Sequence, residues 1–198
     1  MGLKITLSGA LGSGKSTVGK LLAKQLDIPF FSTGMFFRDF AKVRDMDALQ
    51  ANLDAEDNRE IDDYVDGRIL QLDAELPAFI LDSRMAWHFV KQPTRFYLNA
   101  DPKLAAQRVW QDGSRDTESY GSLEEAVEKI AERAASERRR YTQLYHVDIG
   151  DLSNYQHQID TTGASPQQVA ELMIECLELG DQRTRWAMRD TGNFERLD

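Results

Sequence analysis

Cysteine is almost absent from this chain of 198 residues, which contains only Cys176. One thiol excludes an internal disulfide and a cysteine-rich metal site. Cys176 falls in an apolar stripe with helical spacing, so we expect it to be packed in the core rather than reactive. Histidine is scarce too, and the three copies, His88, His146 and His157, are too scattered to predict a metal-ligand pair or a general base.

Long apolar runs and an excess of positive charge are also missing. No stretch approaches the roughly 18 apolar residues that a membrane-spanning helix needs, and the apolar run near the N-terminus is too short for a secretory signal. We therefore expect a cytoplasmic protein that has no membrane partner. The 24 Lys and Arg against 33 Asp and Glu give a formal charge of −9, which argues against binding nucleic acid.

What the chain does have is a glycine-rich turn after a short apolar run at residues 3–8. The turn matches the P-loop template of Gly, four residues, Gly-Lys-Ser/Thr. The residues that we expect to bind ATP are Gly9, Ala10, Leu11, Gly12, Ser13, Gly14, Lys15, Ser16 and Thr17. Glycine lets successive backbone N–H groups point at phosphate. Lys15 should reach the β- and γ-phosphates, and the Ser16 hydroxyl should ligate Mg²⁺.

Apolar runs and helical patterns alternate along the rest of the chain. The runs predict strands at 3–8, 28–33, 78–81, 94–99 and 155–160. The patterns predict helices at 14–25, 35–44, 47–53, 57–72, 123–144 and from Pro102 and Pro166 onward. This order predicts an α/β P-loop fold with a five-stranded parallel sheet and helices on both faces. We expect one kinase domain over residues 1–180, with 181–198 as a charged, peripheral tail.

Residues that follow the predicted strands are the candidates for a binding site, because ligands gather at the carboxyl ends of parallel strands. Arg38 and Arg84 lie there, and Arg108 lies on the helix after the fourth strand. Guanidinium groups bind phosphate with two parallel hydrogen bonds. Asp82 has the position of an acid that holds Mg²⁺ or its water, with capping of the next helix as the alternative. Arg115 and the run 138–140 add further cations, of which at most one or two of the run can enter a cleft.

The reaction class follows from the polar segments between these elements. Residues 45–75 and 112–121 stand where a substrate-binding segment and a lid would lie, and we expect 45–75 and 112–139 to close over the substrates. No Asn-Lys-x-Asp motif for guanine is present. A small-molecule kinase is therefore the first hypothesis. A kinase for another acceptor, such as another nucleoside monophosphate or a shikimate-like compound, and a nucleotide-dependent regulatory binding protein remain the alternatives.

The order of several motifs resembles the cytidylate kinase family, in particular its short, archaeal-type branch. After the P-loop come Ser32-Thr33-Gly34-Met35-Phe36-Phe37-Arg38 and Leu81-Asp82-Ser83-Arg84-Met85-Ala86. They are followed by Ser136-Glu137-x-x-Arg140-Tyr141, Tyr145-x-x-Asp148-x-x-Asp151 and Asp160-Thr161. The resemblance covers roughly residues 1–178 and leaves out the tail.

The resemblance implies transfer of the ATP γ-phosphoryl group to CMP or dCMP with Mg²⁺. We expect a monomer, with a homodimer as the alternative. The resemblance also implies a nucleotide-binding insertion at about 34–76 and a lid at about 112–140. Its site residues would be Arg38 and Arg84 for the acceptor phosphate, Ser32, Gly34, Asp62, Asp66 and Asp82 for the acceptor side, Arg108 for ATP, and Arg140 in the lid. Ser83 and Trp87 replace glycines of the family, and the bulk of Trp87 puts the identity of the acceptor base in question.

Overall fold

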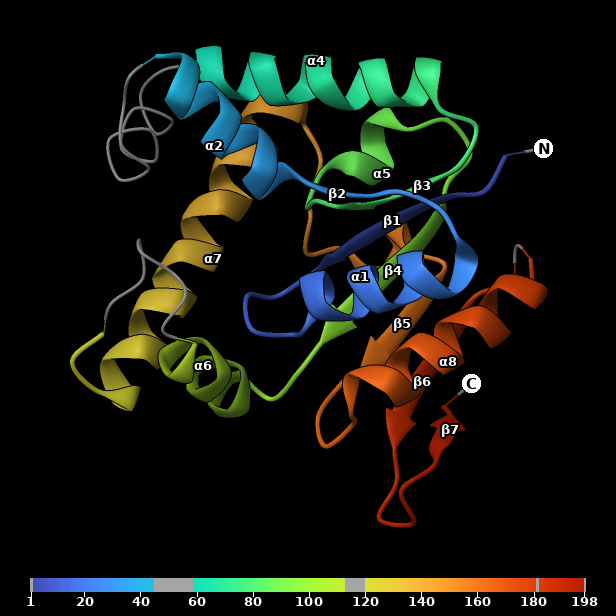
Figure 1. The fold of residues 1–198 in the computed structure, drawn as a ribbon. Coiled ribbons are helices and arrows are strands. Elements are labelled where there is room, and N and C mark those ends of the chain that lie inside the picture. The colour runs from blue at the N-terminus through green and yellow to red at the C-terminus, as the bar shows by residue number, and fades with distance from the viewer. Residues whose placement is uncertain (1, 45–58, 113–119, 181, 198) are drawn as a thin grey trace.

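The computed structural model describes residues 2–44, 59–112, 120–180 and 182–197 (Figure 1). The helix that we predict at 47–53 and Arg115 lie outside these residues. The helices are α1 (Lys15–Leu26), α2 (Thr33–Val43), α4 (Glu60–Glu75), α5 (Ala86–Phe89), α6 (Pro102–Gln111), α7 (Leu123–Tyr145), α8 (Pro166–Glu178) and the 3-10 turn η1 (Leu152–Asn154). The strands are β1 (Lys4–Gly9), β2 (Phe30–Ser32), β3 (Phe79–Asp82), β4 (Thr94–Asn99), β5 (His157–Asp160), β6 (Thr184–Met188) and β7 (Phe194–Arg196).

The strands within the described residues form a single sheet with the order β2-β3-β1-β4-β5-β6-β7. Its pairs are parallel except β6 with β7. The chain moves from β1 to β3 and β2 on one side, and to β4 and β5 on the other. The carboxyl end of β1 is therefore the switch point of the sheet, which is where ligands bind in folds of this kind.

The core is divided between the two faces of the sheet, and β3 shows how. Its four residues are all buried, as expected of a central parallel strand. Ile80 packs with α1 and α8 on one face, whereas Phe79 and Leu81 pack with α2 and α4 on the other. Cys176 is fully buried on α8 and its pKa is raised to about 11 by burial, which confirms that it is a core residue.

The predicted parallel α/β fold is confirmed, and the tail extends it. Residues that we expected to be peripheral form β6, which continues the sheet beside β5, and the antiparallel β7. Thr184 of β6 is buried, and its Oγ1 lies 2.8 Å from Nδ1 of the buried His157. The apolar runs of β6 and β7, Trp186–Met188 and the single Phe194, are too short to predict these strands, although Trp186 and Phe194 pack against the core.

The long helix α7 begins and ends close to its predicted bounds. Ser122 caps it by accepting a hydrogen bond from the backbone N–H of Glu125, and His146 ends it in the left-handed region at φ 57°. Only Ala126 of this helix is buried, so α7 stands largely apart from the sheet, with its first half beside α6 and its end near α4 (Figure 1).

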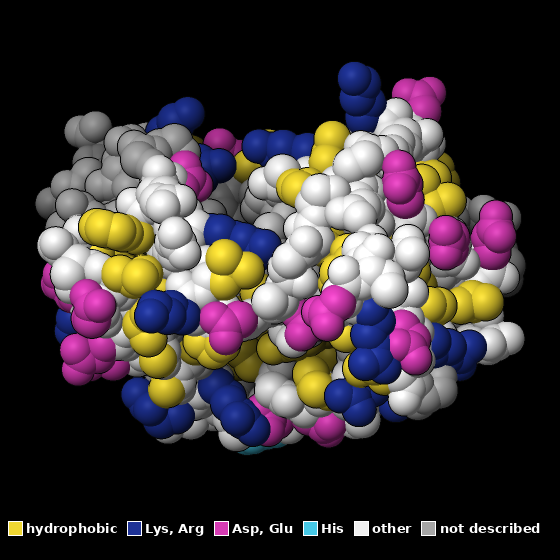
Figure 2. Space-filling view, turned by 90° about the horizontal axis from the view of Figure 1, so that it is seen from below, with side chains coloured by type: hydrophobic (Ala, Val, Ile, Leu, Met, Phe, Trp, Pro, Cys, Tyr) yellow, Lys and Arg dark blue, Asp and Glu magenta, His cyan; other side chains and the backbone are white. Residues whose placement is uncertain are grey.

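The outer surface carries both signs of charge. On the face that Figure 2 shows, basic and acidic side chains are interspersed with apolar ones rather than gathered in one basic patch. Of the helices in the described ranges, none combines the length and the apolar character that crossing a bilayer requires.

Candidate active site

The glycine-rich turn between β1 and α1 is shaped by close contacts with neighbouring backbone. Gly9 has a φ of 136°, and a Cβ there would lie 1.9 Å from the carbonyl oxygen of Leu98. Gly12 has a φ of 78°, and its Cβ would lie 2.2 Å from the carbonyl oxygen of Ala105. Both positions therefore admit only glycine, because a side chain would be strained and would also overlap backbone. The turn is held tightly against β4 and α6.

Lys15 closes the loop from within. Its Nζ donates hydrogen bonds to the carbonyl oxygens of Gly9 at 2.9 Å and Ala10 at 2.6 Å. Ser13 adds a hydrogen bond from Oγ to the same Ala10 oxygen at 2.8 Å. Because α1 begins at Lys15 and has no acidic residue in its first turn, its positive end and the Lys15 ammonium lie together. A positive helix end beside an ammonium group suits the binding of an anion.

Ser16 and Asp82, the two residues that we expect at a metal, are brought into contact. Ser16 donates its hydroxyl hydrogen to Oδ2 of Asp82 across 2.5 Å. Asp82 ends β3 beside Leu7 of β1. No group of three or more His, Cys, Asp or Glu side chains that could hold a metal occurs among the described residues. The oxygen pair fits Mg²⁺, which binds through one or two protein oxygens and completes its shell with phosphates and water.

Arg108 lies on the other side of the loop. Its guanidinium donates to the carbonyl oxygens of Gly12 at 3.3 Å and Thr161 at 3.2 Å. Thr161 in turn donates from Oγ1 to the carbonyl oxygen of Ser13 at 3.1 Å. The structure therefore places Arg108 beside the P-loop, together with the start of the loop after β5.

The acceptor-side candidates lie at the ends of β2 and β3. Ser32 ends β2 at the N-terminus of α2, and Gly34 is exposed in the first turn of that helix. Arg38 is exposed one turn further on, with Nη1 3.6 Å from where a Cβ on Gly34 would lie. Arg84 follows β3 directly, next to Asp82. These four residues share the carboxyl edge of the sheet with the P-loop.

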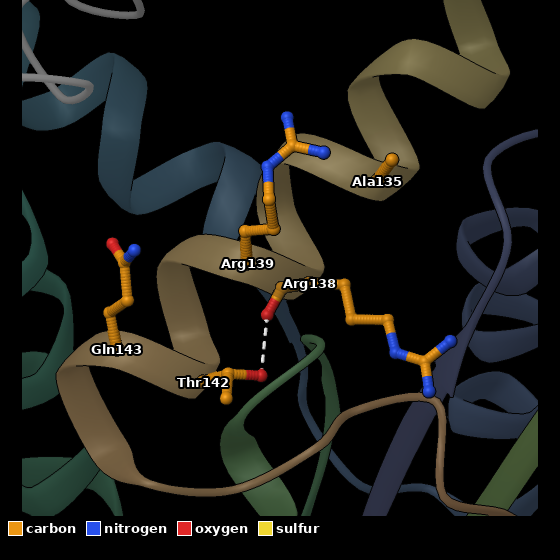
Figure 3. A pocket seen from close by; sticks show the side chains of 5 residues that line it. All are labelled: Ala135, Arg138, Arg139, Thr142 and Gln143. Carbon is orange, nitrogen blue, oxygen red and sulfur yellow. Dashed lines mark hydrogen bonds between the residues drawn. The ribbon is translucent and has the colours of Figure 1, made fainter.

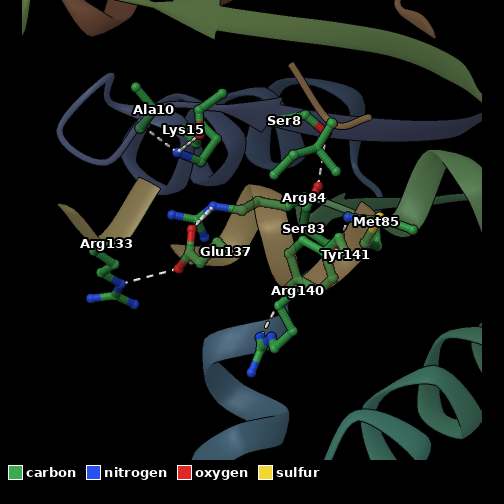
Figure 4. A network of polar contacts seen from close by, with 12 residues as sticks. Ser8, Ala10, Lys15, Ser83, Arg84, Met85, Arg133, Glu137, Arg140 and Tyr141 are labelled. Atoms are coloured by element: carbon green, nitrogen blue, oxygen red, sulfur yellow. Dashed lines mark hydrogen bonds and ion pairs between the residues drawn. The ribbon is translucent and has the colours of Figure 1, made fainter. Parts of the chain in front are cut away.

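Arg84 forms an ion pair with Glu137 of α7 (Figure 4). Its Nε lies 2.5 Å from Oε2 of Glu137, and the other oxygen of Glu137 accepts from Nε of Arg133 at 3.1 Å. Arg133 and Glu137 are four residues apart and share one face of α7, so Glu137 joins this face of the helix to the end of β3.

The side chains of the three arginines 138–140 point in different directions. Nε of Arg138 donates to Oδ1 of Asp148 at 2.6 Å. Arg139 is exposed, and Figure 3 shows it pointing away from Arg138 above an open hollow of about 400 Å³ whose described lining all comes from α7. Nη2 of Arg140 turns towards α4, 3.7 Å from Oδ1 of Asp62.

Asp62 and Asp66 face the end of α7. Burial raises the pKa of Asp62, and the charge of Arg140 partly offsets this rise. Burial also raises the pKa of Asp66 to about 6, although the hydroxyl of Tyr145 donates a hydrogen bond of 2.7 Å to its Oδ2, which lowers that pKa. A carboxyl with this pKa changes its charge near neutral pH. The two acids therefore link α4 to α7 through one ion pair and one hydrogen bond.

Ser83 and Trp87 both make contacts that stabilise the segment after β3. Ser83 Oγ accepts from the backbone N–H groups of Met85 and Ala86, each at 3.2 Å, where the chain enters α5. Trp87 donates from Nε1 to the carbonyl oxygen of Arg84 at 2.8 Å. Its indole packs edge-on against Tyr155, with ring centroids 5.8 Å apart. Trp87 thus steadies the backbone of Arg84.

A cavity of about 370 Å³ opens between the start of the P-loop and α7. Its lining includes Ser8–Leu11, Arg84, Tyr97, Arg133 and Glu137. Sequence reasoning did not assign Tyr97, Arg133 or Glu137 to the site. Glu137 could have been assigned to the site from the sequence, because it belongs to the motif Ser136-Glu137-x-x-Arg140-Tyr141 that also contains Arg140.

Comparison with known proteins agrees with this geometry. A family model described as "AAA domain" matches residues 5–139. The cytidylate kinase of Sulfolobus acidocaldarius is 36% identical over 174 residues, which cover 87% of this chain and 92% of that enzyme. The cytidylate kinase of Methanosphaera stadtmanae is 32% identical over 174 residues, which cover 88% of this chain and 97% of that enzyme. Among solved structures, a shikimate kinase from Bacteroides thetaiotaomicron superposes with a TM-score of 0.65 at 15% identity, covering 90% of this chain and 99% of that one, which shows a shared fold.

Proposed function

This chain belongs to the cytidylate kinase family, and we propose that it transfers the γ-phosphoryl group of ATP to CMP or dCMP. The observation that carries the proposal is the 36% identity to a cytidylate kinase over 87% of the chain. The geometry supports it, because a P-loop and two arginines that suit a second phosphate share one edge of the sheet. An acceptor without a phosphate would bring no anion to Arg38 and Arg84.

In this proposal the donor and acceptor phosphates are held by different parts of the chain. The P-loop amides and Lys15 bind the β- and γ-phosphates of ATP, with Arg108 on the donor side. Arg38 and Arg84 bind the acceptor phosphate, whose oxygen attacks the γ-phosphorus. Phosphoryl transfer depends mostly on positioning and on neutralising the phosphoryl oxygens, and Arg140 supplies a further positive charge there.

Ser16 and Asp82 would hold Mg²⁺, which when bound neutralises charge on the β- and γ-phosphates. The nucleoside of the acceptor would lie against Ser32 and Gly34, with Asp62 and Asp66 contributing from α4. Residues 45–75 and 112–139 would close over the substrates and exclude water that would otherwise hydrolyse ATP. We also propose a monomer, and light scattering tests that point.

A substrate panel tests the proposal. ADP release is measured with CMP, dCMP, UMP, AMP, GMP and shikimate at equal concentrations. We expect CMP and dCMP to be preferred and Lys15→Ala to abolish transfer. A clear preference for a purine nucleotide or for shikimate would refute the assignment. Slow turnover with every acceptor, together with tight ATP binding, would instead indicate a regulatory nucleotide-binding protein.

A second experiment tests the division of the site. Arg84→Ala should raise the KM for CMP far more than the KM for ATP, because a bidentate contact to one phosphate is lost. Arg183→Ala removes an exposed arginine just before β6 and is the control. An equal rise of both KM values in Arg84→Ala would contradict the assignment of Arg84 to the acceptor.

A further inference from the structure

Glu137 joins the two arginines that border the acceptor side of the site. One of its carboxylate oxygens lies 2.5 Å from Arg84, and the other lies 3.1 Å from Arg133. Only 14% of the Glu137 side chain and 23% of the Arg84 side chain are exposed. A single carboxylate therefore neutralises two guanidinium groups at the carboxyl end of β3.

The contact between Glu137 and Arg84 is close but poorly aligned. Oε2 of Glu137 is buried, and within the part of the chain that the structure describes it accepts no hydrogen bond of good geometry. Arginine binds an anion most strongly through parallel, well-aligned hydrogen bonds. A phosphate, with more oxygens and more charge, is a better partner for Arg84 than this carboxylate.

The three side chains border the cavity of about 370 Å³ that begins at Ser8–Leu11 of the P-loop. Figure 4 shows the carboxylate of Glu137 between the guanidinium groups of Arg84 and Arg133. An anion that enters this cavity to bind Arg84 must therefore compete with the carboxylate of Glu137, which already pairs with Arg84.

We propose that Glu137 is a positioning residue that occupies Arg84 and Arg133 in place of the acceptor phosphate until that phosphate displaces it. The inference rests on the proposed function, which assigns the acceptor phosphate to Arg84. Displacement frees α7 from the end of β3, and this helix carries Arg140 one turn further on. Arg84 and Arg133 thus stay paired with Glu137 while ATP alone is bound, and they become available to bind phosphate when the acceptor arrives.

The test is Glu137→Gln, which keeps the shape of the side chain and removes its charge. The KM for CMP should fall at least about threefold, the effect of releasing one partly exposed ion pair. The KM for ATP should stay unchanged, and ADP release without acceptor should rise, because the cations are no longer neutralised. Glu132→Gln is the matched control, since Glu132 lies on the same helix and pairs with Lys129 at the surface; it should behave like the wild type.

An unchanged or raised KM for CMP in a folded Glu137→Gln variant would refute the inference while leaving the proposed function intact, provided that the wild type phosphorylates CMP. A wild type that phosphorylates no cytidine nucleotide refutes the proposed function instead. Calorimetric titration with inorganic phosphate then decides the role of Glu137, because the variant should still bind phosphate more tightly than the wild type, and equal affinity would refute that role.

If the variant does not fold, a crystal structure of the wild type with CMP gives the answer. The separation between Nε of Arg84 and Oε2 of Glu137 should then exceed about 4 Å, the usual limit of an ion pair. A retained contact beside a bound phosphate would refute the displacement.

Discussion

His157 should make the stability of this protein fall steeply in mild acid. The side chain is fully buried at the junction of β5 and the C-terminal strands, beside Thr184 and against the ring of Phe96. Burial lowers its pKa from 6.5 to about 4, and the positive charge of Arg196 acts in the same direction. The folded chain therefore keeps this imidazole neutral at pH values where the unfolded chain protonates it.

The sign and size of the effect follow from that difference. Between pH 6.5 and about pH 4 the unfolded state binds one proton more at this position than the folded state, so the free energy of unfolding falls as the pH falls. Each unit of pKa difference corresponds to about 1.4 kcal/mol. The shift of His157 to about 4 thus removes on the order of 3 kcal/mol of stability by pH 4.

Urea unfolding followed by circular dichroism at pH 7, 6, 5 and 4 measures this loss. His157→Gln cannot titrate, so its free energy of unfolding should fall by about 3 kcal/mol less over the same range than that of the wild type. His88→Gln, an exposed histidine substitution, should follow the wild type. Parallel curves for the wild type and His157→Gln would refute the reasoning.

Three further substitutions test the site. Gly12→Ala should abolish ATP binding in a folded protein, because the added Cβ lies 2.2 Å from the carbonyl oxygen of Ala105. Gly163→Ala is the control, since Gly163 also has a positive φ but a Cβ there would have nothing within 4 Å. This variant should still bind ATP in equilibrium dialysis. Ser83→Ala should lower the free energy of unfolding by about 1 kcal/mol, because the backbone N–H groups of Met85 and Ala86 lose their acceptor, and a changed ranking of CMP and UMP would contradict this purely structural role. Trp87→Phe should raise the KM for CMP by loosening the backbone of Arg84, and an unaltered KM would contradict it.

The features that could be predicted from the sequence are those with local causes. The P-loop follows from glycines that the backbone requires, and α7 follows from sustained helical spacing, so its predicted end is within one residue of the observed one. Strands β3 and β4 are short apolar runs with clear borders. In each case the chain's own residues within one element decide the conformation.

The features that could not be predicted depend on contacts between distant segments. The pairing of Arg84 with Glu137 requires the end of β3 and a turn of α7 to meet, and no pattern in either segment indicates it. Strand β6 is stabilised by β5 and by the contact of His157 with Thr184, whereas its own apolar run is only three residues long and is flanked by arginines. The contacts of Arg140 with Asp62 and of Tyr145 with Asp66 also join distant segments, because they link α7 to α4.

The hydrogen bond from Ser16 to Asp82 fixes the rotation of a group that would otherwise turn freely. A hydroxyl has one hydrogen and two lone pairs. Since the hydrogen is held by Asp82, the lone pairs must point elsewhere, and Ser16 is exposed at the start of α1. A cation carried in with a nucleotide would meet an oxygen that already presents its electron pairs. The orientation of the Ser16 hydroxyl is therefore set when β3, which carries Asp82, pairs in the sheet, before any ligand binds.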